Sequence, residues 1–131
     1  MTPNIQARLI VADVDEAIAY YVSCLGARRG PRHADPSGHV VHAELTVGES
    51  TFSLAQAHDG YRLYAPGSLG GSPLLLTLNV DDARAVGAAM VAGGGRVVVP
   101  IEDRPYGRRQ GRVEDPFGHL WVVSQLLAPA A

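Results

Sequence analysis

An internal repeat constrains the fold of this chain more than any other feature. Each half of the 131 residues reads as a strand, a helix and then three strands, with an offset of about 66 to 70 residues. The matching positions are Val11 and Val80, Asp13 and Asp82, and Gly26 and Gly95. One unit of this size is too small to bury its own sheet, so two should pack together with their helices outside. The repeat predicts an α+β fold in which two βαβββ modules form a curved, open barrel-like mixed sheet around a concave cleft.

Local patterns place the elements of both modules. Alternating apolar residues predict a strand over 5–11, after which Asp13 or Asp15 can cap a helix that ends at Gly26. In the second half, the acids at 81–82 open a helix that the glycines at 93–95 end. The remaining expected strands cover 28–33, 39–46, 51–55, 74–80, 96–101, 107–114 and 120–126. Asp-Pro-Ser-Gly at 35–38 and Asp-Pro-Phe-Gly at 115–118 predict turns between strands.

We expect the two modules to form a single domain that covers 1–131. Module one covers 1–57, a connecting loop covers 58–72, and module two covers 73–131. The loop is rich in glycine and has no readable periodicity, which is typical of a functional loop. We expect its Tyr61 and Tyr64 to be exposed or to close over a ligand.

Composition excludes several classes of function. The chain has eleven arginines and thirteen acidic residues, a net charge of −2, which disfavours a nucleic-acid-binding protein. It has no lysine, which excludes Schiff-base chemistry, and its single Cys24 excludes an intramolecular disulfide. The sequence shows neither a secretion signal nor an apolar run of about 18 residues. We therefore expect a cytoplasmic protein that does not bind membranes.

Two motifs resemble those of the vicinal-oxygen-chelate superfamily, which includes glyoxalases, bleomycin-resistance proteins and dioxygenases. The first is Val11-x-Asp13 followed by Ala17-x-x-Tyr20-Tyr21-x-x-x-Leu25-Gly26. The second is the run YGRRQGRVEDPFGHLW at 106–121, which looks like the closing hairpin of the bleomycin-resistance and PhnB-like branch. The resemblance implies a homodimer, because clefts of this family are usually completed across a two-fold interface.

The resemblance also implies where a metal ion would bind in the enzymes of this superfamily. The four equivalent positions fall near Gln6, Ser53, Leu75 and Val122. Leucine and valine side chains cannot ligate a metal, and serine is a poor ligand. We therefore expect neither a metal nor another cofactor, and we assign no catalytic residue. An alternative is a rearranged metal site built from Gln6, His42 or Glu44.

Without a metal, the cleft should favour a flat, aromatic or hydrophobic small molecule. The predicted ligand-binding residues are Gln6, His39, Phe52, Tyr61, Tyr64, Tyr106, Gly107, Arg108 and Trp121. Tyr106-Gly107 stands where bleomycin-resistance proteins carry an aromatic-glycine pair that stacks on the drug. The stretch 32–39 lacks the aromatic residue of the corresponding loop, so we expect a ligand other than bleomycin.

Three functions remain open at this point. The first is a metal-free binding protein that sequesters an aromatic or hydrophobic natural product and so confers antibiotic resistance or self-resistance. The second is a metal-dependent lyase or isomerase of the glyoxalase type. The third is an accessory protein that binds an intermediate or a partner in natural-product biosynthesis. Binding without catalysis agrees best with the apolar residues at the metal positions.

Overall fold

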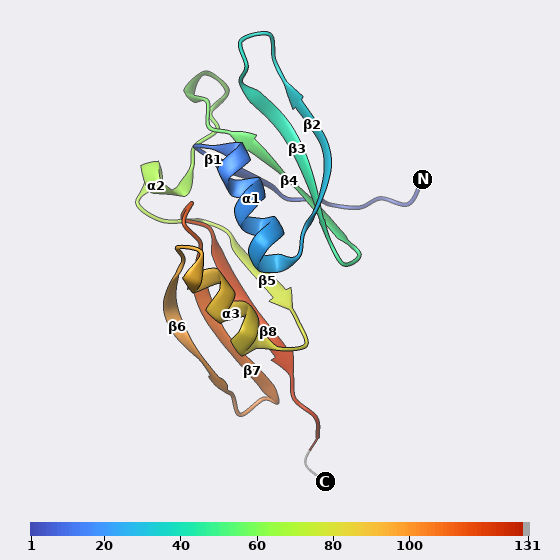
Figure 1. Ribbon diagram of the computed structural model, residues 1–131, viewed down its shortest axis with the longest axis vertical. Coiled ribbons are helices and arrows are strands. Elements are labelled where there is room, and N and C mark those ends of the chain that lie inside the picture. Colours follow the sequence, from blue (N-terminus) through green and yellow to red (C-terminus); the bar gives the residue numbers. More distant parts are fainter. Residues whose placement is uncertain (130–131) are drawn as a thin grey trace. The chain divides into compact units, whose positions relative to one another are not determined.

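A computed structural model describes residues 1–129 and divides the chain into two compact units. The first unit covers Met1–Leu69 and the second begins at Gly70, so the division falls inside the predicted connecting loop. Each unit holds one mixed sheet of four strands (Figure 1). The predicted α+β class and the βαβββ order of each module are confirmed.

The first unit runs through five main elements. They are β1 (Arg8–Val11), α1 (Val14–Leu25), β2 (Arg28–Ala34), β3 (Val40–Val47) and β4 (Ser50–Gln56). The sheet order is β1-β4-β3-β2, with β1 and β4 parallel and the other pairs antiparallel. The first strand is shorter than expected, because 5–7 precede the paired residues and Ile5 is fully exposed.

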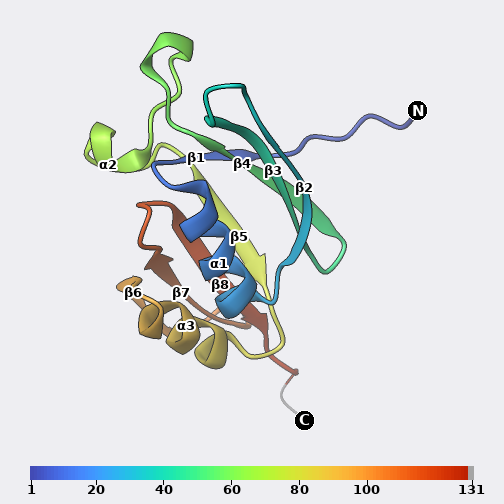
Figure 2. The same cartoon turned by 45° about the horizontal axis from the view of Figure 1, so that its top comes forward.

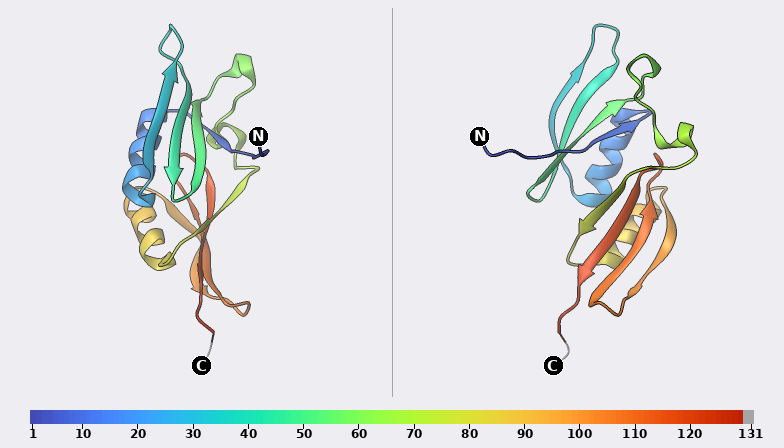
Figure 3. Two further views of the ribbon diagram at one scale, coloured as in Figure 1. Left: turned by 90° about the vertical axis from the view of Figure 1, so that its right-hand side faces the viewer. Right: turned by 180° about the vertical axis from the view of Figure 1, so that it is seen from behind.

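Helix α1 covers one face of this sheet, as Figure 3 shows. Leu9, Leu45 and Leu54 are fully buried between the sheet and the helix. The Tyr21 ring meets the edge of Phe52 with ring centroids 5.7 Å apart. Because side chains alternate along a strand, Ser53 and its neighbour two residues on, Ala55, belong to the opposite face.

The second unit repeats this arrangement. Its elements are β5 (Leu75–Asn79), α3 (Ala83–Ala92), β6 (Arg96–Asp103), β7 (Arg108–Glu114) and β8 (Leu120–Leu126). The sheet order is β5-β8-β7-β6, with β5 and β8 parallel. Gln125 accepts a hydrogen bond from the backbone of Ala83 at the start of α3. Residues of β8 that share a face with Gln125, among them Trp121 and Val123, therefore point towards α3 and form the core with Met90.

Both main helices begin at an aspartate, as the repeat predicts. Asp13 accepts from the backbone of Glu16, and Asp82 accepts from the backbone of Ala85, each at 3.0 Å. Helix α1 ends at Gly26 as predicted, and α3 ends at the predicted run of glycines, with Gly93 as its C-cap. Gly26 has φ +66 after α1, but Gly94 rather than Gly95 has a positive φ after α3. The pairing of Gly26 with Gly95 expected from the repeat therefore shifts to Gly94, since α1 has 12 residues and α3 has 10.

The predicted loop at 58–72 contains short elements that periodicity cannot reveal. A 3₁₀ turn, η1 (Asp59–Tyr61), is followed by the one-turn helix α2 (Pro66–Leu69), both visible in Figure 2. An isolated bridge joins His58 and Leu63 around η1. In the described part of the chain, 1–129, none of the helices has the length and apolarity needed to span a membrane.

Two Asp-Pro-x-Gly-His turns have the same hydrogen-bond pattern. Asp35 accepts from the backbone nitrogens of Ser37 and His39, between β2 and β3. Asp115 accepts from the backbone nitrogens of Phe117 and His119, between β7 and β8. The two turns therefore confirm the predicted turns and hold the ends of their strands in the same way.

The pKa of Asp35 lies below its usual range because the Ser37 hydroxyl donates to the carboxylate, with the His39 backbone as a further donor. A lowered pKa contributes stability above the unfolded-state pKa, and this contribution is lost as the pH falls through the folded-state pKa. We expect Ser37→Ala to raise the pKa of Asp35 in a carboxyl NMR titration. An unchanged pKa would contradict the assigned cause.

Candidate functional site

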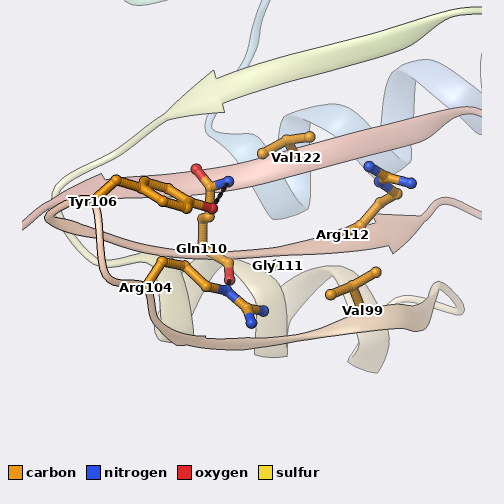
Figure 4. Close-up of a pocket in the computed structure, with 7 residues that line it drawn as sticks. All are labelled: Val99, Arg104, Tyr106, Gln110, Gly111, Arg112 and Val122. Atoms are coloured by element: carbon orange, nitrogen blue, oxygen red, sulfur yellow. Dashed lines mark hydrogen bonds between the residues drawn. The ribbon is translucent and has the colours of Figure 1, made fainter.

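A pocket of about 390 Å³ opens in the second unit, on the sheet face opposite α3. Its lining residues come from β6, β7, β8 and the bend between β6 and β7, and they are drawn in Figure 4. They are Val99, Arg104, Tyr106, Gln110, Gly111, Arg112 and Val122. Side chains alternate along a strand, and Val113 of β7 and Trp121 of β8 point into the core. Gln110, Arg112 and Val122 therefore point to the other face of the sheet, where the pocket lies.

A hydrogen-bond chain holds the aromatic wall of this pocket. The Gln110 side-chain amide donates to the Tyr106 hydroxyl at 2.8 Å. The carbonyl oxygen of the same amide accepts from the Ser124 hydroxyl at 2.9 Å. Tyr106 itself is 64% exposed, so its ring is fixed at the hydroxyl while its surface remains open to a ligand.

Arg104 supports the bend rather than facing a ligand. Its guanidinium donates to the backbone oxygens of Gln110 and Pro100, at 3.0 and 2.5 Å. The Glu102 carboxylate lies 3.8 Å from the same guanidinium. These contacts replace ladder hydrogen bonds where the β6–β7 register shifts between Val99 and Glu102.

Gly111 allows β6 to cross close to β7 at the floor of the pocket. A Cβ atom at this position would lie 2.5 Å from the backbone oxygen of Val99 and 2.7 Å from the backbone nitrogen of Ile101. Such distances are well inside van der Waals contact, so only glycine fits without a shift of the backbone. The pocket therefore depends on a residue without a side chain.

Arg112 differs from the other polar residues of the pocket. Its buried Nε atom has no hydrogen-bond partner within residues 1–129. The nearest acid along the strand, Glu114, is engaged by Arg96 at 2.6 Å. An unsatisfied buried donor costs on the order of 1–3 kcal/mol, more when it is charged. Arg112 is therefore the group of this pocket with unused binding capacity.

The second unit contains four of the predicted ligand-binding residues. Tyr106 lines the pocket, and Gly107 forms the adjacent bend with φ +81. Arg108 reaches Asn79 at 3.4 Å instead of the pocket. Trp121 lies in the core, where its indole nitrogen donates to Asp115 at 2.9 Å and leaves the ring 5% exposed.

The first unit contains the other five predicted residues. Gln6 precedes β1 and is exposed, whereas Phe52 packs against Tyr21 below α1. The His39 ring stands edge-on to His58, with centroids 4.8 Å apart, and Tyr61 packs on the same imidazole at 4.4 Å. Tyr64 is 43% exposed in the segment before α2. The structure thus brings His39 and Tyr61 together around His58.

Sequence reasoning did not identify Val99, Gln110, Gly111 and Arg112 as ligand-binding residues. The alternation of side chains along β7 could have identified Gln110 and Arg112. If Val113 points into the core, these two residues must point to the other face, together with Val122. The register shift in β6 gave no signal in the sequence, and it is this shift that places Val99 opposite Arg112.

Three of the four residues at the positions that bind a metal in the superfamily's enzymes do not fit such an ion; the fourth, Gln6, is exposed before β1. The Ser53 hydroxyl accepts from the Arg8 guanidinium at 3.0 Å, and Leu75 and Val122 offer only hydrocarbon. The Nδ1 atom of His42, named above for a rearranged site, faces the same Arg8 guanidinium at 2.8 Å. Across residues 1–129, no three His, Cys, Asp or Glu side chains are grouped so that they could hold a metal ion.

Comparison with known proteins gives consistent results. Residues 5–123 match the family model of the Glyoxalase/Bleomycin resistance protein/Dioxygenase superfamily. The uncharacterized protein Mb0911c of Mycobacterium bovis is 35% identical over 126 residues, which cover 94% of this chain and 83% of the relative. The crystal structure of TioX from Micromonospora sp. ML1 is 26% identical, with a TM-score of 0.70 and coverage of 98% of this chain and 100% of that one. Protein PA1353 from Pseudomonas aeruginosa is 25% identical, with a TM-score of 0.75 and coverage of 97% and 100%.

Proposed function

Because the chain belongs to the Glyoxalase/Bleomycin resistance protein/Dioxygenase superfamily, we propose that it is a binding protein that sequesters a small aromatic or hydrophobic natural product. The pocket lining is the observation that supports this function most strongly. It combines the Tyr106 ring with the hydrocarbon of Val99 and Val122. Among the described residues that line it, none is an acid, a histidine or a cysteine.

The size and shape of the pocket suit a flat ligand of modest size. A volume of about 390 Å³ lies within the range of small-molecule sites, roughly 300–1,000 Å³. Stacking on an aromatic ring contributes about 0.5–1.5 kcal/mol beyond the burial of apolar area. Because Gln110 already holds the Tyr106 hydroxyl, a ligand need not immobilise this ring on binding. Sequestration requires binding energy but no catalytic groups, and the Tyr106 ring held by Gln110 can supply part of that energy.

A role in antibiotic resistance follows if the sequestered molecule is toxic to the cell that makes this protein. The superfamily includes bleomycin-resistance proteins, and Tyr106, Val99 and Val122 favour a ligand with an aromatic or hydrophobic part. The metal-dependent alternative has no comparable support, because the donors at the superfamily's metal positions do not fit a divalent ion.

We expect Tyr106→Ala to weaken binding of the neutral probe 2-naphthamide about tenfold, or about 1.4 kcal/mol, because the stacking surface is removed. Tyr106→Phe keeps the ring and loses only the hydrogen bond from Gln110, so its affinity should stay within about threefold of the wild type. Isothermal titration calorimetry measures both dissociation constants. Equal affinity in the wild type and Tyr106→Ala would place the ligand elsewhere.

A further inference from the structure

We propose that the ligand of this pocket carries a carboxylate, which the Arg112 guanidinium binds while the aromatic part of the ligand lies against Tyr106. This inference rests on the proposed function and adds the chemical class of the ligand, a planar aromatic acid. The ligand expected from the sequence needs only a flat, aromatic or hydrophobic body. An acidic group is a separate requirement, and it comes from the state of Arg112 in the structure.

Arg112 has a buried donor that the described part of the protein leaves unpaired, whereas the other polar side chains of the pocket bond to protein groups. Tyr106 and Gln110 bond to each other, and Arg104 donates to two backbone carbonyls. Within residues 1–129, the buried Nε of Arg112 has no hydrogen-bond partner. A guanidinium presents its donors as a planar fork that matches both oxygens of a carboxylate. A ligand carboxylate would satisfy the donors that the protein leaves open.

The charge around Arg112 also favours an anionic ligand. The acids nearest to the pocket are already engaged, Glu114 by Arg96 and Glu102 by Arg104. The residues that line the pocket include two arginines and, within the described chain, no acid. Other arginines of this unit lie beside acceptors, such as Arg109 beside Asp103 at 2.6 Å. The pocket therefore carries positive charge that a bound anion would neutralise.

The Arg112 side chain has apolar neighbours on both adjacent strands. The strand register places it opposite Val99 on β6 and opposite Val122 on β8. Apolar walls on both sides reduce the screening of the charge by water, so an ion pair formed there is stronger than one on an open surface. The same walls fit the hydrocarbon part of an aromatic acid.

The arrangement in Figure 4 also sets the orientation of the ligand. Tyr106 and Arg112 lie towards opposite ends of the pocket, and Gln110 lies on the side of Tyr106. Gln110, which anchors the Tyr106 hydroxyl, is two residues from Arg112, so roughly 6.5 Å of strand separates the two positions, close to the length of a two-ring system. A ligand with its ring at Tyr106 and its acid at Arg112 would span this distance.

The test uses two probes of nearly equal shape, 2-naphthoate and 2-naphthamide, titrated calorimetrically at pH 7.5. We expect the wild type to bind the acid at least tenfold more tightly than the amide. Arg112→Gln should remove this preference and still bind the amide, which shows that its pocket is intact. Arg112→Lys keeps the charge without the fork and should retain part of the preference. Arg109→Gln is the matched control, because it removes the same charge from the same strand on the face opposite Gln110.

The Nε–H resonance of Arg112 gives a second readout by NMR. It should shift on addition of the acid and much less on addition of the amide. Equal affinity for both probes, or an acid preference that persists in Arg112→Gln, would overturn the inference and leave the proposed binding function in place. Failure of both probes to bind the wild type at millimolar concentration would contradict the proposed function, and the inference would fall with it.

Discussion

Replacing Gly111 with alanine is expected to lower the free energy of unfolding by about 3 kcal/mol and to disrupt the pocket. The added Cβ would lie 2.5 Å from the backbone oxygen of Val99 and 2.7 Å from Pro100, both of which belong to β6. Backbone atoms cannot move aside as a flexible side chain can. Strand β6 would therefore have to separate from β7, and Val99 and Arg104 would move with it.

Urea unfolding followed by circular dichroism measures this loss. Gly67→Ala is the matched control, because a Cβ at Gly67 meets no atom within 4 Å and the substitution lies in α2 of the other unit. We expect the control to unfold within about 0.5 kcal/mol of the wild type. If Gly111→Ala unfolds at the same urea concentration as the control, then β6 and β7 are not in close contact at the pocket.

Replacing Asp115 with alanine is expected to cost about 3–4 kcal/mol of unfolding free energy. The carboxylate is buried and accepts from two backbone nitrogens, those of Phe117 and His119, and from the Trp121 indole nitrogen. Removing it leaves several buried donors without an acceptor. The loss should be visible both in urea unfolding and in a red shift of the Trp121 fluorescence as water reaches the indole.

Asp35→Ala is the matched comparison for this prediction. Asp35 makes the same two backbone hydrogen bonds in a turn of the same sequence pattern, but it is more exposed, and its side-chain donor is the Ser37 hydroxyl rather than a buried ring. Its loss should therefore destabilise the protein much less than the loss of Asp115. Equal destabilisation by the two substitutions would show that the Trp121 contact and burial contribute little.

The fold was predictable where local chemistry decides it. Asp13 and Asp82 cap their helices as their positions in the repeat indicate, and both Asp-Pro turns form between strands. The end of α3 falls in the predicted run of glycines at 93–95, but the repeat paired Gly26 with Gly95, whereas the glycine with a positive φ is Gly94. The short turns η1 and α2 are too brief to produce a periodic pattern.

The candidate site was predictable only in part. Tyr106 lines the pocket, as its position beside Gly107 indicated, whereas Trp121 is buried in the core of its unit and the half-buried Phe52 packs against Tyr21. The aromatic character of Trp121 suggested a ligand contact. Its direction is instead set by strand alternation, because Trp121 is on the same face of β8 as Gln125, which bonds to the start of α3. The unused donors of Arg112 could not be predicted, because they depend on which acids the other arginines engage.

The most direct test of binding at this pocket is a crystal structure of the protein grown with 2-naphthoate. The naphthalene ring should lie against Tyr106, between Val99 and Val122, with the carboxylate on the Arg112 guanidinium. A ring bound outside the second unit, or at the pocket with its carboxylate turned away from Arg112 and towards solvent, would contradict the account.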